Sequence, residues 1–103
     1  MDIRLKKQSD FDLVFKRGKR LFSESLTLIY IASKQTKVGF AVSKGNGKSV
    51  QRNRVKRLLR EAFRSLYQVK TENFFFVFIP KKRSEYSYEV FKRDMQYLLN
   101  KVK

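Results

Sequence analysis

The stretch Phe74-Phe75-Phe76-Val77-Phe78-Ile79, followed by Pro80, is apolar at every position. A short apolar run that stops at proline is typical of a central strand covered on both faces. A strand of this kind needs partner strands beside it and helices packed on the sheet. The stretch therefore predicts an α+β domain in which helices pack on a small mixed sheet.

The rest of the chain supplies those partners. Residues 9–17 predict a short helix, with Ser9 as N-cap, Asp12 as its capping-box partner and Gly18 as the stop. Three stretches rich in β-forming residues predict strands: 20–23, 26–33 and 38–43. Two amphipathic stretches predict longer helices: 50–67 and 87–101. The predicted order is α-β-β-β-α-β-α in a single domain over residues 1–103.

The charge balance indicates the kind of partner. Lys and Arg number 25 and Asp and Glu number 9, which gives a formal net charge of +16. Solubility alone needs a net charge of only about 2–8 in a small domain. An excess of this size repels itself in the folded state unless a polyanion neutralises it. Nucleic acid is the first candidate, since phosphate contacts supply most of its affinity for proteins.

Two residue types are missing, and this excludes several classes of site. The chain has no Cys and no His, which excludes disulfides, thiolate zinc sites and His-based acid–base catalysis. The N-terminal residues lack the apolar core of a signal peptide, and no apolar run has the length of a membrane span. We expect a cytoplasmic protein with no membrane partner.

The helix predicted at residues 50–67 has two different faces when its residues are spaced at about 100°. Its apolar face carries Val55, Leu58, Leu59, Ala62 and Leu66, with Phe63 beside them. Its cationic face carries Arg52, Asn53, Lys56, Arg57, Arg60 and Arg64. Arg54 and Glu61 lie on the remaining edge.

The spacing of the cations favours binding over simple solvation. Arg52, Lys56 and Arg60 are four residues apart, and like charges at this spacing each cost a helix a few tenths of a kcal/mol. A solvated face usually mixes signs, whereas Glu61 is the single acid here. Guanidinium groups can grip two phosphate oxygens at once. The helix therefore predicts a phosphate-binding surface.

Two stretches of the sequence resemble the signature of the bacterial ribonuclease P protein family. The first is Gly39-Phe40-Ala41-Val42-Ser43-Lys44, a strand that ends in Val-Ser-Lys. The second is the run from Val50 to Arg64, which contains the triplet Arg-Asn-Arg followed by Lys-Arg, two leucines and Arg. The stretch Ser9 to Gly18 is also similar to the first helix of that family.

The resemblance implies a role beside a catalytic RNA. Family members pair with the ribonuclease P RNA, which cleaves the 5′ leader from precursor tRNA with Mg²⁺ held at the RNA active site. The implied fold has a left-handed β-α-β crossover, although about 98% of such crossovers are right-handed. No catalytic residue and no metal ligand is expected on this chain.

The resemblance also implies two groups of site residues. The residues expected to bind the RNA subunit are Arg52, Asn53, Arg54, Lys56, Arg57 and Arg60, with Arg64 on the same face. A cleft between the first helix and the sheet is expected to hold the leader, through Phe11, Phe15, Tyr30 and Lys44. Aromatic rings stack unpaired bases with little sequence preference. For Phe11 and Phe15, plain core packing is the competing interpretation, whereas the hydroxyl of Tyr30 favours a surface position.

The loop at residues 45–49 departs from the common family pattern. Many members carry Gly-Asn-Ala directly before the basic helix, and here the residues are Gly47, Lys48 and Ser49. Any role of that Asn does not transfer to this chain.

Three other functions compete with this hypothesis. A ribosomal or chaperone-like RNA-binding protein would use the same helix without any part in cleavage. An autonomous nuclease would need converging carboxylates, but the acids are scattered singly, except for Asp10 and Asp12. A membrane-surface protein would bind lipid through the apolar face of this helix, but that face is needed to cover the sheet.

Overall fold

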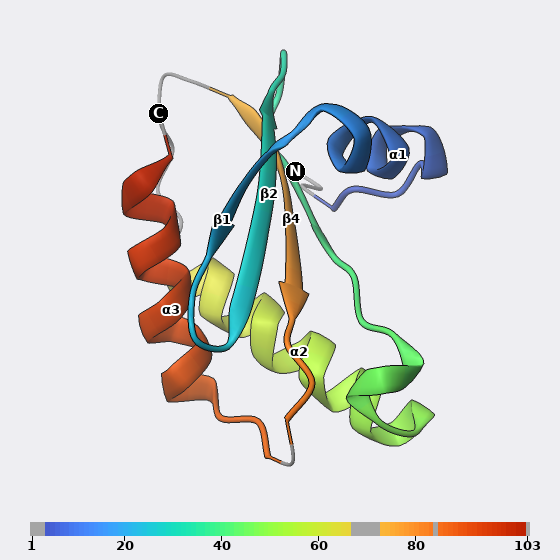
Figure 1. Ribbon diagram of the computed structural model, residues 1–103, viewed down its shortest axis with the longest axis vertical. Coiled ribbons are helices and arrows are strands. Elements are labelled where there is room, and N and C mark those ends of the chain that lie inside the picture. Colours follow the sequence, from blue (N-terminus) through green and yellow to red (C-terminus); the bar gives the residue numbers. More distant parts are fainter. Residues whose placement is uncertain (1–3, 67–72, 84, 103) are drawn as a thin grey trace.

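The computed structural model describes residues 4–66, 73–83 and 85–102. The elements follow the predicted order, with a 3-10 turn, η1, added before the second long helix. They are α1 (Gln8–Arg17), β1 (Lys19–Phe22), β2 (Leu26–Ala32), β3 (Lys37–Phe40), η1 (Lys44–Asn46), α2 (Ser49–Leu66), β4 (Phe74–Pro80) and α3 (Tyr88–Lys101). Figure 1 shows their arrangement around the sheet.

The sheet has four strands in the order β1-β2-β4-β3. β2 is antiparallel to both β1 and β4, with Leu28 opposite Phe78. β3 runs parallel to β4, with Gly39 opposite Val77. The all-apolar β4 thus has a strand on either side, as its sequence predicts.

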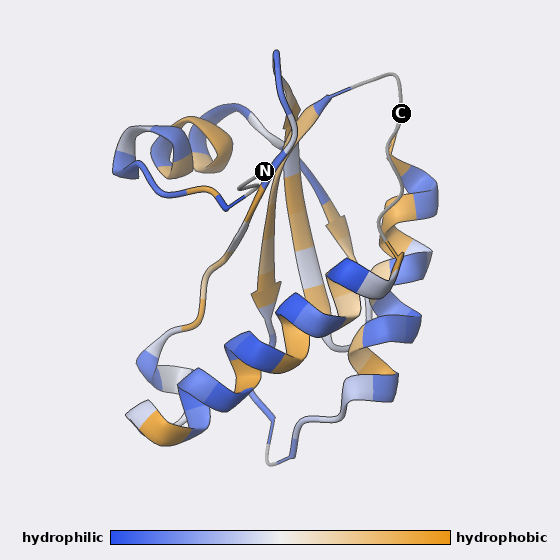
Figure 2. Cartoon of the chain, turned by 180° about the vertical axis from the view of Figure 1, so that it is seen from behind, coloured by the Kyte–Doolittle hydropathy of each residue, from blue (hydrophilic) through white to orange (hydrophobic). Residues whose placement is uncertain are grey.

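The crossover from β3 to β4 passes through α2. In Figure 2, α2 lies in front of the sheet and both strands run downward. When the strands are turned to point upward, the chain moves from right to left as it passes from β3 to β4, which is the left-handed sense. This agrees with the resemblance and differs from about 98% of β-α-β units.

Helices cover the two faces of the sheet unequally. The face under α2 and α3, here called the closed face, includes Leu28, Phe76 and Phe78, together with Phe63 of α2 and Met95 of α3. The other face, here called the α1 face, includes Ile29, Phe75 and Val77, together with Val14 of α1. Because side chains alternate along a strand, neighbouring residues of β4 belong to different faces.

The start of α1 differs from the prediction. The helix begins at Gln8, one residue early, and its N-cap is Lys7, which makes no side-chain capping hydrogen bond. Ser9 therefore lies inside the first turn, and the predicted capping box is wrong. Instead, Gln8 Nε2 donates a hydrogen bond to Asp12 Oδ1 at 3.0 Å.

Strand β3 begins at residue 37, one residue before the predicted 38–43, and ends at Phe40, three residues early. Ala41 N still donates to Phe78 O at 3.0 Å, and the predicted alternation holds: Val38, Phe40 and Val42 belong to the closed face. Beyond them the chain turns into η1, which leads into α2.

Candidate nucleic-acid interface

Helix α2 packs on the closed face through the apolar side that the sequence predicts. Val55, Leu59, Ala62 and Phe63 are buried, and Leu58 and Leu66 are partly buried. The ring of Phe63 lies 5.9 Å from that of Phe78. Figure 2 shows the hydrophobic positions of α2 toward the sheet and the hydrophilic ones outside.

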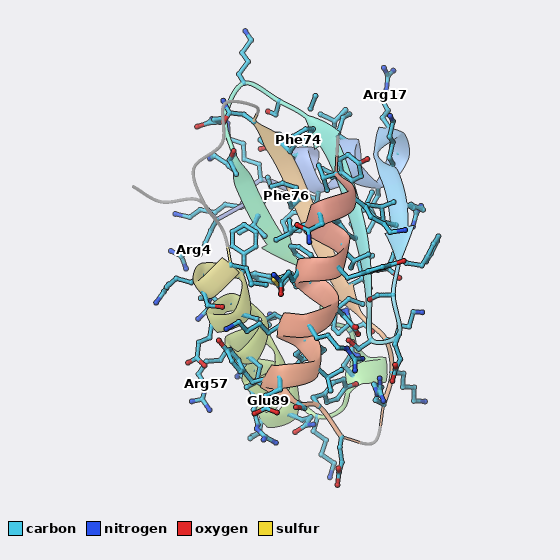
Figure 3. All side chains as sticks on the ribbon, turned by 90° about the vertical axis from the view of Figure 1, so that its left-hand side faces the viewer. Arg4, Arg17, Arg57, Phe74, Phe76 and Glu89 are labelled. Carbon is cyan, nitrogen blue, oxygen red and sulfur yellow. The ribbon has the colours of Figure 1, made fainter. Side chains whose placement is uncertain are left out.

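The opposite side of α2 is the cationic face, which consists of Arg52, Asn53, Lys56, Arg57, Arg60 and Arg64. Asn53, Arg57, Arg60 and Arg64 are exposed, and Arg52 and Lys56 are partly buried. Figure 3 shows Arg57 pointing away from the sheet. Arg54, on the neighbouring edge, is also exposed. The structure thus brings all seven predicted RNA-binding residues together on one helix, away from its buried apolar positions.

These cations have no acidic partners within the described part of the chain. The ion pairs found there join Arg83 and Arg93 to Glu24, and Arg93 to Asp94. None involves α2. The Nε–H group of Arg52 is shielded from solvent and donates to no partner among the described residues. A shielded donor without a partner costs free energy, and the exposed members of the cationic face are the ones open to an outside acceptor.

Asn46, in the 3-10 turn η1 before α2, is a buried polar residue whose role the sequence did not reveal. Asn46 is 5% exposed. Its Nδ2 donates to Pro80 O at 3.2 Å and to Tyr86 Oη at 3.0 Å, and its Oδ1 accepts from Ser43 N at 3.0 Å. Gly47 follows with φ of 113°, a conformation that favours glycine. An Asn beside such a glycine was the available signal for a fixed turn.

Two predicted leader-binding rings lie between α1 and the sheet. Phe11 and Phe15 are both half-buried and pack on the α1 face. A Cβ atom on Gly39 would lie 2.6 Å from the Phe11 ring, so that ring sits directly on the backbone of β3. Each ring therefore combines core packing with a partly exposed surface.

Tyr30 does not lie with these rings, and its predicted surface position is wrong. Its side chain is 6% exposed and belongs to the closed face. There its ring meets that of Phe74 edge-on, with the centroids 5.7 Å apart. The alternation of β2 places Ile29, not Tyr30, toward α1. The register of the strand, which residue type does not reveal, decides the difference.

Lys44 is exposed at the first position of η1. In the sequence, Lys44 comes after β3 and before α2. The predicted contact between Lys44 and a leader stays a prediction.

The buried acid among the described residues has a structural partner. Asp94 of α3 is 5% exposed, and its Oδ2 accepts hydrogen bonds from the backbone N–H of Ser25, at 2.9 Å, and from the Ser25 hydroxyl. Burial raises the pKa of Asp94, but the bonds from Ser25 and Arg93 outweigh it and lower the pKa overall. The pKa of Arg93 is raised by its hydrogen bond to Asp94. This cluster ties α3 to the turn between β1 and β2.

Two classes of site are not found in the described residues. No three His, Cys, Asp or Glu side chains gather there into a group that could hold a metal ion. In the same residues, no helix is long and apolar enough to cross a bilayer.

The fold and the site together define a small basic α+β protein with a cationic helix, the class that binds nucleic acid. The family model for Ribonuclease P matches residues 1–103. A Ribonuclease P protein component from Clostridium kluyveri is 41% identical and covers 99% of this chain and 96% of its own length. One from Bacillus velezensis is 36% identical and covers 96% of this chain and 88% of its own.

Solved structures show the same fold. The ribonuclease P protein from Thermotoga maritima superimposes with a TM-score of 0.85 at 29% identity and covers 97% of both chains. The protein from Staphylococcus aureus, at 22% identity, has a TM-score of 0.84 over 97% of this chain and 94% of its own. The chain belongs to the ribonuclease P protein family.

Proposed function

We propose that this chain binds the ribonuclease P RNA through the cationic face of α2 and holds the 5′ leader of precursor tRNA against the α1 face. The family is the protein component of ribonuclease P, the ribonucleoprotein endonuclease that matures tRNA 5′ ends. The observation that carries the proposal is the cationic face, where exposed Arg side chains lack acidic partners in the described part of the chain.

The RNA supplies the chemistry in this proposal. Ribonuclease P needs a divalent metal, and we assign Mg²⁺ to the RNA active site. The described residues offer no carboxylate cluster to hold it, and a two-metal nuclease requires converging carboxylates. Asp94 is the one buried acid among them, and its oxygen atoms are already bonded to Ser25 and Arg93. The protein's contribution is to bind and position RNA in the cytoplasm.

The cationic face suits RNA phosphates for two reasons. The rows Arg52–Lys56–Arg60 and Arg57–Arg64 run along a helix that is anchored to the sheet on its other side, so the charges are presented in a fixed array. The planar guanidinium groups can donate two hydrogen bonds to one phosphate. Asn53 adds an amide that can reach a base edge or a ribose hydroxyl.

The α1 face suits a single-stranded leader. Phe11 and Phe15 expose part of their rings beside the sheet, and base stacking on aromatic rings tolerates any sequence. A leader that differs from one tRNA to the next requires such tolerance. Lys44 adds a positive charge after β3, toward the start of α2.

The experiment is cleavage of a precursor tRNA at low Mg²⁺ by a bacterial ribonuclease P RNA, with and without the protein. We expect the protein to restore cleavage and to be inert alone. The variant Arg52→Ala with Arg57→Ala should weaken assembly and lower the salt slope by about one to two, since the slope counts neutralised phosphates. Lys34→Ala with Lys101→Ala, two exposed cations outside α2, is the matched control.

Two results would contradict the proposal. An unchanged salt slope in the α2 variant would show that the cationic face does not meet phosphate. RNA binding without any gain in cleavage, across several such RNAs, would favour a general RNA-binding protein instead.

A further inference from the structure

The α1 face has a second half that α1 does not cover. Register pairs Phe22 of β1 with Thr27 of β2, and Thr27 with Ile79 of β4, so the three side chains form a row across the sheet. Thr27 is two residues from Ile29, which belongs to the α1 face. Because residues two apart on a strand share a face, the whole row lies on that face.

This row is open to solvent. Phe22 is 62% exposed, which for a phenylalanine is a large exposed apolar area, and Thr27 and Ile79 are partly buried. Figure 1 shows α1 over one end of the sheet, with the end near the β1–β2 turn uncovered on the same side. Single exposed rings are common, but this one extends a partly exposed apolar surface that already includes Phe15.

The surroundings of the row are positively charged. Arg20 lies opposite Ile29 on the same face, two residues before Phe22. Its Nη2 donates to Phe15 O at 3.4 Å, so Arg20 lies next to both Phe15 and Phe22. Lys81 Nζ donates to Ser23 O at 2.6 Å, next to Phe22 in the chain. The nearby acid, Glu24, is engaged by Arg83 at 3.6 Å and by Arg93 of α3 at 3.2 Å.

An exposed ring with cations beside it fits single-stranded RNA better than a second copy of this chain. Two copies, each with a formal charge of +16, would repel each other, and Lys19 and Arg20 on the edge strand oppose strand pairing. RNA offers phosphate for the cations and a flat base for the ring, on a sheet surface of the kind that stacks unpaired bases.

We propose that the precursor leader continues past Phe11 and Phe15 onto this row, where a base stacks on Phe22 and Arg20 meets the adjoining phosphate. The proposal rests on the function proposed above and adds residues 20, 22, 27 and 79 to the leader surface. Phe22 thereby makes affinity depend on leader length, because only a leader long enough to cross the α1 half reaches it.

The chain has no tryptophan, so Phe22→Trp creates a unique fluorescent reporter at an exposed position. With the holoenzyme assembled on its RNA, precursors whose leaders grow one nucleotide at a time are added. We expect quenching to begin at a threshold length and to be absent with mature tRNA. Tyr97→Trp, at another exposed ring on α3 (50% exposed), is the matched reporter and should show no threshold.

Affinity measurements complete the test. Phe22→Ala and Phe22→Leu should each lose about tenfold in affinity, within the range measured for one stacked base, for leaders beyond the threshold and nothing for shorter ones. A loss of affinity with leucine as well as with alanine would show that binding depends on the aromatic ring and not on apolar volume alone. Thermal melting of both variants is expected to match that of the parent protein, since the ring is mostly exposed.

The outcomes separate the two proposals. If Phe15→Ala weakens precursor binding while the Phe22 variants bind every leader like the parent, the leader leaves the protein earlier and the extension is wrong. If Phe22 variants lose equally on precursor and mature tRNA, the row does not bind the leader. If neither ring matters and the α2 variant still assembles normally, the function proposed above fails.

Discussion

The two faces of one sheet differ in how far helices cover them. On the closed face, α2 and α3 leave Leu28 and Phe78 with no exposed surface. On the α1 face, one shorter helix leaves Phe15 and Ile79 half-buried and Phe22 mostly exposed. The same strands supply both faces through their alternating side chains. The comparison shows that the closed face is the more completely buried side of the sheet, whereas the α1 face keeps part of its apolar surface open to solvent.

The largest expected effect is on the closed face. Phe78→Ala should lower the free energy of unfolding by about 3–5 kcal/mol, because it removes a buried ring and leaves a cavity. Chemical denaturation measures this loss, and Phe22→Ala is the control, with a change within about 0.5 kcal/mol. Similar losses for both variants would end the distinction between the faces.

A smaller effect is expected at the hydrogen bonds between Asp94 of α3 and Ser25, in the turn between β1 and β2. Asp94→Asn should cost about 2 kcal/mol, since two bonds from Ser25 lose their charged acceptor. The folded pKa of Asp94 is lowered. Its contribution is therefore present above the unfolded pKa of about 3.9 and is lost as the pH falls through the lower folded value.

Stability measured from neutral pH down to strong acid checks that prediction. The parent protein should lose this contribution below pH 4 or so, as Asp94 takes up its proton, and the Asn variant should lack this part of the decline. Parallel pH curves for the two proteins would show that Asp94 does not contribute through its charge.

A smaller loss of stability again is expected at the covered end of the α1 face. Phe15→Ala should cost about 1–2 kcal/mol, less than a fully buried ring, because the side chain is half-buried. Its affinity for precursor tRNA should fall far more than that for mature tRNA, because only the precursor has a base to stack. Equal losses on both would indicate core damage and would remove the functional contrast between the faces.

Local patterns predicted the elements well, for identifiable reasons. The apolar run at residues 74–79 requires cover on both sides, and the structure places β4 between β2 and β3 with rings on both faces. The 3.6-residue period at α2 separated Val55 and Leu59 from Arg57 and Arg60, and the structure confirms that separation. Each pattern lies within a single helix or strand, so it can be recognised in the sequence without knowledge of distant partners.

Errors arose at one helix boundary and where a side chain depends on distant partners. The capping box at Ser9 failed because α1 starts at Gln8. Asn46 was missed because its partners, Pro80 and Tyr86, are more than thirty residues away in the sequence. The Asn-Gly pair indicates a turn, but no local pattern predicts its bonds to these distant residues.

The sequence by itself determined the order of the elements, the two-sided helix α2 and the excess of positive charge, because these follow from short-range periodicity and composition. Only the tertiary structure decided which aromatic rings stand on which face. Strand register places Tyr30 on the closed face, beneath α2 and α3. Because α1 covers only one end of the other face, Phe22 remains exposed. Those outcomes depend on pairing and cover between distant segments, which residue type and spacing do not specify.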